Sequence, residues 1–356
     1  MEGHRTYPNP AIELLEGNVL FSRLPQLIQL YQVVGSPYLS RHPAWLRILN
    51  LSLGHRPVCL VAGERASSEP KAILPLCLVK SRLFGAFLVG LPYVNLGGVL
   101  GYPDATGSLI TSAAGLADRW NVRYLELRHE EPVSHPALGA VVQSKVHMRL
   151  PLPESRDTLW QSFSPKVRNQ IRKAEKLGLE IVCGRHEQLG SFYRVFARNM
   201  RDLGTPVFPK SLFAAILDEF PEAELVIVRY QNRAVAGGLL LHGPGATEIP
   251  SASSLRPWNW TNANMLLYWT ALGRAIERGQ RLFDFGRSTV DSPTYRFKKQ
   301  WGAVPYPAYW QYYVRQGKVG EMRPDSPRFR LAVQIWRRLP VWFTRWIGPM
   351  IVRGIP

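Results

Sequence analysis

The first 150 residues alternate short apolar runs with polar turns, a pattern that predicts a mixed sheet with covering helices. Apolar residues at helical spacing predict helices over about 24–34, 42–54 and 106–121. Runs typical of strands lie at 57–62, 72–79, 86–91, 95–100, 124–128 and 141–150. We expect these strands to form one sheet that the helices cover. No group of catalytic residue types gathers in this half of the sequence.

After Pro151 the alternation of helices and strands begins again. Ser164 and Pro165 are typical of a helix start, and Gly178 is typical of a helix end. These signals predict a helix over about 165–177. Further helices are predicted over 192–201 and 263–278, and strands over 224–230, 235–242, 246–251 and 282–285.

Length and composition limit the architecture and the class of partner. With 356 residues, of which 46% are hydrophobic and 20% charged, the chain is long enough for two domains with separate cores. The 44 lysines and arginines exceed the 26 acidic residues, which leaves a formal net charge of +18. Such an excess predicts an anionic partner. Phosphate-bearing donors, transfer RNA, nucleotide-linked sugars and an anionic membrane face all satisfy that prediction.

The cysteines, the N-terminus and the longest apolar stretch bear on where in the cell the protein is expected. Cys59, Cys77 and Cys183 are odd in number and widely spaced, so neither a disulfide framework nor a zinc cluster is indicated. The N-terminus lacks the apolar run of a signal peptide. The apolar stretch 72–99 is interrupted by charged residues and glycines, unlike a membrane span. We therefore expect a cytoplasmic protein.

Two loops of the first half invite a functional interpretation. His129, Glu130 and Glu131 are adjacent, but neighbouring side chains on a loop diverge, so a solvated turn is favoured over a metal site. The sequence Pro-Tyr-Val-Asn-Leu-Gly-Gly at 92–98 favours a tight turn between strands, with the border of a substrate cleft as the alternative.

Candidate chemistry concentrates in residues 281–302, where a short apolar strand opens into a polar loop. Asp284 interrupts the strand, and Arg287 follows the glycine that ends it. Lys298 and Lys299 come later, next to aromatic residues. Opposite charges close to aromatic residues indicate a functional site. The alternative is a surface loop closed by salt bridges.

The same stretch carries a family resemblance. The sequence Phe-Asp-Phe-Gly-Arg-Ser at 283–288, followed by Phe-Lys-Lys-Gln-Trp-Gly at 297–302, resembles the signature of FemAB-type acyltransferases. These Gcn5-related (GNAT) proteins include the peptidoglycan-bridge aminoacyltransferases. Segments 166–174, 199–206 and 264–269 agree, and their order and spacing resemble most closely the FemAB-like branch associated with exosortase/PEP-CTERM and exopolysaccharide systems.

The resemblance, which covers about residues 155–315, implies a fold and an activity. It implies a mixed α+β or α/β protein of two tandem GNAT-like domains, each a mixed sheet flanked by helices. We expect a degenerate GNAT-like domain over 1–150, a FemAB-like acyltransferase domain over 151–316 and a helical, basic aromatic tail over 317–356. The implied activity is acyl or aminoacyl transfer to an amine of a cell-envelope, peptidoglycan or exopolysaccharide precursor. The alternative is a noncatalytic GNAT-like scaffold of an exopolysaccharide or exosortase system.

The resemblance also assigns roles to residues. Lys298 is expected to stabilise negative charge on the donor phosphate or the developing oxyanion, with Arg287 as a helper. Asp284 or Asp202 is expected to orient or deprotonate the amine. The expected substrate-binding residues are Lys166, Arg168, Arg172, Arg201, Asp202, Thr205, Tyr268, Ser288, Lys299 and Trp301. The alternatives are a solvated face for the basic residues of 165–177, a helix stop at 202–205 and core packing for the aromatic residues of 263–278.

The identity of the acyl donor stays open between aminoacyl-tRNA and acyl-CoA. Related acetyltransferases bind the coenzyme A pyrophosphate on a glycine-rich loop before a helix, and residues 255–263 stand there without a glycine. The coiled-coil arm with which many bridge-forming members meet transfer RNA has no counterpart either. We expect no tightly bound cofactor, no metal and, in the absence of a recognisable motif, no sequence-specific nucleic-acid binding.

The C-terminal residues 327–356 combine tryptophans and phenylalanines with arginines and few acids. Their apolar positions form helical stripes that Pro340 and Pro349 interrupt. Short helices of this composition suit the plane of an anionic membrane surface, which would make the protein peripheral on the inner face of the cytoplasmic membrane. The alternative is an arm that packs its tryptophans on the N-terminal domain.

Overall fold

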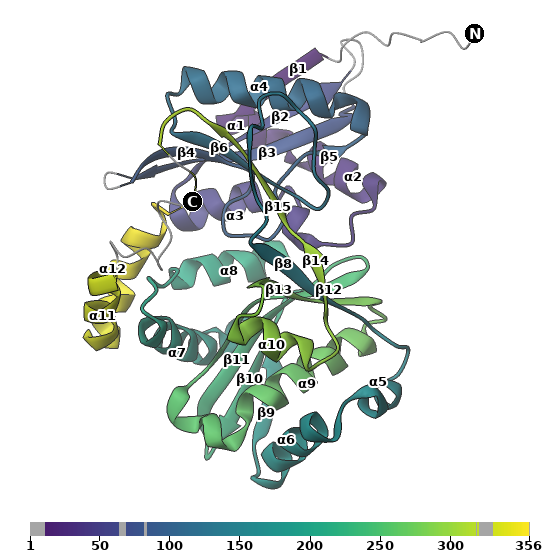
Figure 1. Ribbon diagram of the computed structural model, residues 1–356, viewed down its shortest axis with the longest axis vertical. Coiled ribbons are helices and arrows are strands. Elements are labelled where there is room, and N and C mark those ends of the chain that lie inside the picture. The colour runs from purple at the N-terminus through teal and green to yellow at the C-terminus, as the bar shows by residue number, and fades with distance from the viewer. Residues whose placement is uncertain (1–10, 64–68, 82–83, 318, 320–329, 356) are drawn as a thin grey trace.

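The computed structural model describes residues 11–63, 69–81, 84–317, 319 and 330–355, which form two mixed sheets flanked by helices (Figure 1). One sheet lies above the other, and the chain crosses between them near the middle of the molecule (Figure 1). This arrangement confirms the predicted fold class.

The first sheet has the strand order β1-β2-β3-β4-β6-β15-β7, and β5 pairs with β3. Its strands are β1 (Ala11–Glu16), β2 (Arg56–Gly63), β3 (Ala72–Ser81), β4 (Gly85–Val89), β5 (Leu100–Gly101), β6 (Tyr124–His129), β7 (Ala140–Val142) and β15 (Tyr309–Val314). Its helices are α1 (Gly17–Ser22), α2 (Leu24–Val34), η1 (Leu39–Arg41), α3 (Trp45–Leu53), η2 (Pro103–Ala105) and α4 (Thr106–Arg119). Strands β4 and β6 run parallel.

The second sheet has the strand order β14-β8-β13-β12-β11-β10-β9. Its strands are β8 (Lys145–Pro151), β9 (Glu180–Gly184), β10 (Glu224–Tyr230), β11 (Arg233–His242), β12 (Ala246–Ser254), β13 (Leu282–Thr289) and β14 (Val304–Pro307). Its helices are α5 (Arg156–Ser162), α6 (Pro165–Lys176), α7 (His186–Leu203), α8 (Lys210–Glu219), η3 (Arg256–Thr261), α9 (Ala263–Glu277) and α10 (Pro293–Lys299), and α11 (Arg330–Arg338) and α12 (Val341–Val352) form the tail.

The two sheets exchange segments of the chain. The predicted strand 141–150 is divided, because β7 belongs to the first sheet and β8 pairs with β13 and β14 of the second. Strand β15, which follows the second sheet in sequence, pairs with β6 and β7 of the first. The boundary that we placed at residue 150 therefore falls inside β8. The alternation of apolar and polar residues in a strand shows which face is buried, but it does not show which other strand pairs with it.

A shared core joins the two parts. Buried residues of α2 and α3 belong to one cluster with buried residues of α7, α8, β10 and β11. The rings of Trp45 and Phe220 lie 5.7 Å apart across this contact, and Arg47 pairs with Glu219 at 2.7 Å on its margin. Because an apolar interface of this kind resists shearing, side chains from both parts can hold fixed positions at one site.

Most predicted elements are confirmed, with two instructive differences. The helix predicted over 165–177 is α6, and the Ser164 side chain accepts a hydrogen bond from Val167 N as a cap. The strand predicted over 95–100 is wrong, since only Leu100–Gly101 is extended. The preceding residues form a loop in which Tyr93 has a φ of 71°. Helices α1, α5, α8 and α10 and strands β1, β9, β14 and β15 were not predicted.

Candidate active site

Strands β12 and β13 run parallel for three residue pairs and then separate. Their register ends at Glu248 opposite Asp284. Against β11, β12 carries an extra residue at Ile249–Pro250, and against β8, β13 carries one at Phe285–Gly286. Bulges bend the strand that holds them, and proline cannot donate to a ladder. Gly286 has a φ of 77°, which favours glycine. The two bulges therefore part the strands just beyond the carboxylate pair.

The two carboxylates at the parting point are buried, with Glu248 2% and Asp284 1% exposed. Glu248 Oε2 accepts a hydrogen bond from Ser40 N at 2.8 Å. Asp284 Oδ1 accepts from Gly286 N at 2.6 Å, and its Oδ2 accepts from Arg149 Nε at 3.2 Å. Burial and the neighbouring Asp284 raise the pKa of Glu248 to about 7. Glu248 can therefore exchange a proton near neutral pH.

An ion network connects this pair to the first part of the molecule. Arg149 Nη2 lies 2.8 Å from Glu130 Oε1, and Glu130 also meets Arg41 at 3.7 Å. The Arg149 guanidinium lies 4.5 Å from the ring centroid of Tyr38. Glu130, from the loop that we predicted to be a solvated turn, is thus part of an interface between the two parts. Within the described residues no group of three metal-ligating side chains exists.

The predicted cations Lys298 and Arg287 flank the bulge in β13. Lys298 Nζ donates to the carbonyls of Gly286 at 3.1 Å and Arg287 at 2.9 Å, and burial lowers its pKa to about 8. Arg287 Nε donates to Asn95 Oδ1 at 3.1 Å, and its guanidinium lies 4.4 Å from the ring centroid of Trp310. Asn95 belongs to the 92–98 loop, so this loop does border the junction between the parts.

Sequence reasoning missed at least three residues of this site, Glu248, Arg149 and His147. His147 is 1% exposed, and neither ring nitrogen has a hydrogen-bond partner among the described residues. Burial and the cations Arg149, Arg287 and Lys298 lower its pKa to about 3, so the imidazole is neutral. Ser288 Oγ, a predicted site atom, is likewise buried without a described partner. In the β8–β13 register His147 lies opposite Arg287 and Ser288 lies opposite Val146, so these two buried polar side chains face opposite sides of the sheet. A lone histidine in a strand gave no sequence signal.

A cavity of about 280 Å³ opens at the N-terminus of α9, and Lys298 is not among its lining residues. Its walls come from α6, the end of β12, η3, α9 and α10, and include Gln170, Ser254, Asn259, Asn262, Phe297 and Gln300. The loop without glycine forms η3, where Trp258 and Trp260 pack around Tyr230. Backbone amides at a helix start favour anions, but bulky η3 limits how closely a phosphate can approach.

The remaining predicted residues lie in three places. Tyr268 and Trp301 are 7% and 1% exposed and pack with Phe163, Phe285 and Phe297, so they belong to the hydrophobic core. The Arg201 guanidinium donates to Asp202 and to the carbonyl of Leu339, and Thr205 N donates to Met200 O, which places this segment beside the tail. Lys166, Arg172 and Lys299 are exposed and Arg168 is half-buried.

Comparisons with known proteins agree with this fold. Residues 161–299, which include β12, β13, α9 and α10, match the family model described as an acetyltransferase (GNAT) domain. The fold is that of two tandem GNAT-like domains. None of the curated proteins matches the sequence.

Three solved structures show the same fold over most of the chain. FemX has a TM-score of 0.61 at 17% identity, covering 85% of this chain and 97% of FemX. The C-terminal domain of a putative lysylphosphatidylglycerol synthetase from Agrobacterium fabrum has a TM-score of 0.54 at 11% identity, covering 83% and 93%. A tandem GNAT protein from the clavulanic acid biosynthesis pathway has a TM-score of 0.52 at 14% identity, covering 86% and 99%.

Proposed function

We propose that this protein is an N-acyltransferase that forms an amide on an amine of a cell-envelope precursor, within the FemAB-like branch associated with exopolysaccharide and exosortase systems. The observation that carries the proposal is the buried Glu248–Asp284 pair at the point where β12 and β13 part. The GNAT domain match over 161–299 supports acyl transfer as the reaction class. The sequence signature at 283–302 supports the envelope precursor as acceptor.

The reaction requires an amine that has lost its proton. In the proposed mechanism the carboxylate pair receives a proton from the acceptor ammonium, and Glu248 is suited to this because its pKa lies near 7. The free amine then attacks the acyl carbonyl, the new C–N bond forms, and the bond to the donor oxygen or sulfur breaks. The leaving atom takes up a proton as the amide nitrogen loses one. Burial raises the pKa of Asp284, and the ion pair with Arg149 opposes this shift.

The cations of the site would stabilise negative charge during this step. Lys298 uses two N–H groups on the carbonyls of the β13 bulge, so its third N–H is the one that could face a developing oxyanion. For the donor, we propose that its phosphates bind along α6. Gln170 of α6 lines the cavity at α9, and the same helix carries Lys166, Arg168 and Arg172.

Transfer of a labelled acyl group tests the proposal. Purified protein is supplied with labelled acetyl-CoA or labelled aminoacyl-tRNA, together with nucleotide-linked and lipid-linked envelope precursors. The expected product carries label that resists hydroxylamine, because an amide survives the reagent that cleaves esters and thioesters. Glu248→Gln should slow transfer by about 100-fold or more, as expected for loss of a general base. The control Glu277→Gln changes a half-exposed glutamate of α9 and should leave the rate unchanged.

A noncatalytic scaffold is the second candidate, and one observation favours it. The side-chain N–H groups of Lys298 and Arg287 already donate hydrogen bonds to oxygens of the protein. Such bonds are typical of residues with a structural role. The scaffold proposal is supported if neither donor labels any precursor while the protein still binds one of them. Full activity of Glu248→Gln would instead reject the carboxylate pair as the proton acceptor.

A further inference from the structure

Helix α12 has two opposite faces, and one of them is apolar and unpaired. Thr344 and Val352 on its inner face are 1% and 6% exposed. Trp342, Trp346 and Met350 are spaced four residues apart and therefore share one face of the helix. This outer face is exposed, with 69%, 68% and 60% of the three side chains accessible to solvent. Helix α11 adds Leu331 and Ile335, which are 68% and 53% exposed. We call these five side chains (Leu331, Ile335, Trp342, Trp346 and Met350) the apolar tail face.

The tail helices are fixed on the body of the protein, so the apolar tail face has a defined orientation. Both helices contact α7 and lie at the margin of the molecule (Figure 1). Arg201 and Arg337 tie the two segments together through the carbonyls of Leu339 and Leu203. A Cβ on Gly348 would lie 2.9 Å from Val207 N, which shows how closely α12 packs. The tryptophans Trp342 and Trp346 thus face outward, not onto the N-terminal part as the alternative had predicted.

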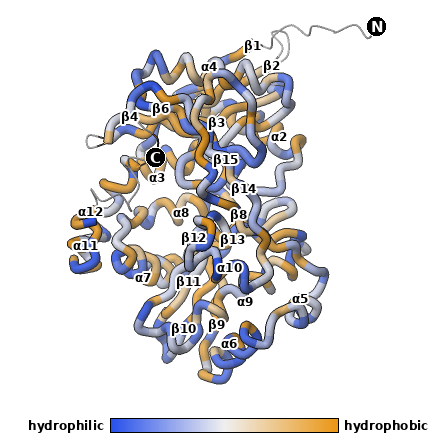
Figure 2. The backbone as a smooth tube through the Cα atoms, viewed as in Figure 1, coloured by the Kyte–Doolittle hydropathy of each residue, from blue (hydrophilic) through white to orange (hydrophobic). Residues whose placement is uncertain are grey.

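The charged residues of the tail helices themselves have one sign. Residues 330–355 contain five arginines and no acidic residue. Hydrophilic and hydrophobic positions alternate along α11 (Figure 2), whereas Arg345 is the only charged residue of α12. Of the described helices, none is long and apolar enough to cross a membrane. Exposed tryptophans beside arginines on short helices suit the boundary between lipid headgroups and acyl chains.

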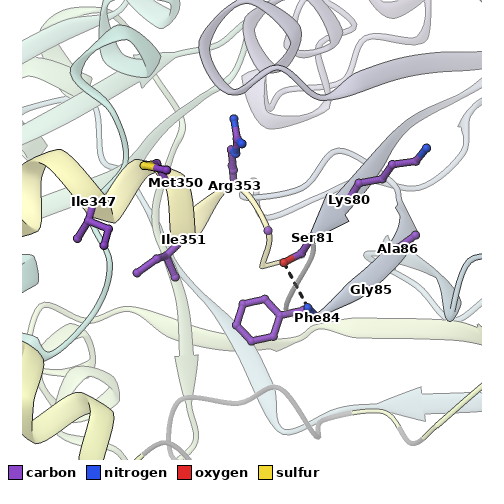
Figure 3. A pocket seen from close by; sticks show the side chains of 10 residues that line it. Lys80, Ser81, Phe84, Gly85, Ala86, Ile347, Met350, Ile351 and Arg353 are labelled. Carbon is purple, nitrogen blue, oxygen red and sulfur yellow. Dashed lines mark hydrogen bonds between the residues drawn. The ribbon is translucent and has the colours of Figure 1, made fainter.

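A cavity of about 910 Å³ continues the apolar surface inward. Ile347, Met350 and Ile351 of α12 line one side, and Phe84 lines the other (Figure 3). Lys80 and Arg353 line the same cavity with cationic side chains (Figure 3). Met350 belongs both to the apolar tail face and to this cavity, so the two surfaces are continuous.

We propose that the apolar tail face docks α11 and α12 into the plane of an anionic phospholipid bilayer. The tryptophans and Met350 enter the headgroup boundary, and the arginines meet lipid phosphates. A second copy of this chain fits the surface less well, because pairing two such faces would bring together two tails that carry arginines and no acidic residue. This proposal is independent of acyl transfer, since it concerns a surface away from the carboxylate pair.

Binding to vesicles tests the proposal without any substrate. The full-length protein should sediment with vesicles of phosphatidylglycerol and phosphatidylcholine, bind pure phosphatidylcholine weakly and dissociate as salt rises. The double variant Trp342→Ala/Trp346→Ala should lower affinity for the mixed vesicles by about tenfold or more. Brominated lipids should quench tryptophan fluorescence of the native protein but much less that of the double variant.

A control variant distinguishes loss of the apolar tail face from loss of an exposed tryptophan elsewhere on the protein. Trp260 on η3 is 50% exposed, and Trp260→Ala should bind vesicles like the native protein. Thermal unfolding should be unchanged in both variants, because the side chains removed are exposed. Equal vesicle affinity of the double variant and the native protein would overturn the proposal. So would a dimer in lipid-free solution that the double variant fails to form.

Discussion

Glu248 and Asp284 illustrate how two carboxylates behave when a fold forces them together in a dry interior. The pair sits on adjacent parallel strands, and each member accepts a backbone N–H. Arg149 compensates Asp284 through an ion pair at 3.2 Å, while Glu248 receives no arginine at that distance among the described ion pairs. Two like charges at short range in low dielectric are costly, so the less compensated carboxylate retains its proton to higher pH.

The raised pKa of Glu248 predicts how stability depends on pH. The folded protein keeps this proton up to about pH 7, whereas the unfolded chain releases it near about pH 4.3. The unfolding free energy should therefore fall as pH rises through this window, by up to about 3 kcal/mol from this group. Urea titrations at several pH values measure the unfolding free energy. In Glu248→Gln this free energy should fall less as pH rises than it does in the native protein. An identical pH dependence in the variant would contradict the assignment.

At the scale of elements, the loop between β4 and β5 decides how the junction between the parts is built. Gly97 pairs with Arg128 of β6 through two backbone hydrogen bonds of 3.0 Å. A Cβ on Gly97 would lie 1.7 Å from the carbonyl oxygen of Gly90. The loop can therefore fold back on β4 only with glycine at this position, and it then presents Asn95 to Arg287.

Substitution of this glycine should be severe. Gly97→Ala is expected to lower the unfolding free energy by about 3 kcal/mol or more, because backbone must move to admit the methyl group. Gly115→Ala is the control, since Gly115 lies in helix α4 with nothing within 4 Å of its Cβ position. That change should stabilise by up to about 1 kcal/mol. Chemical denaturation of both variants checks the prediction, and a mild effect of Gly97→Ala would refute the close approach.

At the scale of the whole molecule, the two sheets are coupled twice. Their helices share one hydrophobic cluster, and strand β15 returns from the second part to complete the first sheet. Gln311 of β15 holds this return in place by donating to Val133 O and by accepting from Val133 N. Neither part can lose its structure without exposing apolar surface and strand edges of the other.

The coupling predicts one cooperative unfolding transition. Calorimetry should show a single peak whose van't Hoff and calorimetric enthalpies agree. Gln311→Ala removes buried hydrogen bonds of the first sheet, at a cost of about 1–3 kcal/mol, and should lower the midpoint of the whole transition. Two resolved transitions, with only one of them shifted by Gln311→Ala, would show that the parts unfold separately.

Local signals in the sequence determined most of the longer helices, most strands and the residue types of the site. Caps such as Ser164 and the apolar periodicity of α2 and α6 act within a few residues, so they can be recognised without the fold. The stretch 281–302 likewise predicted a short strand that opens into a polar loop, with Asp284, Arg287 and Lys298 as its charged residues, whereas the bulge in this strand came only from the structure. The positive tail and its aromatic residues were also evident from composition.

The tertiary structure alone decided which of these signals meet. Strand pairing joins residues far apart in sequence, so the exchange of β8 and β15 leaves no local trace. Glu248 and His147 gain their properties only from burial beside Asp284, Arg149 and Lys298. The same burial turned Tyr268 and Trp301 from predicted binding residues into core. A residue's pKa and its access to a ligand depend on its surroundings in space, and the sequence specifies those surroundings only through the complete fold.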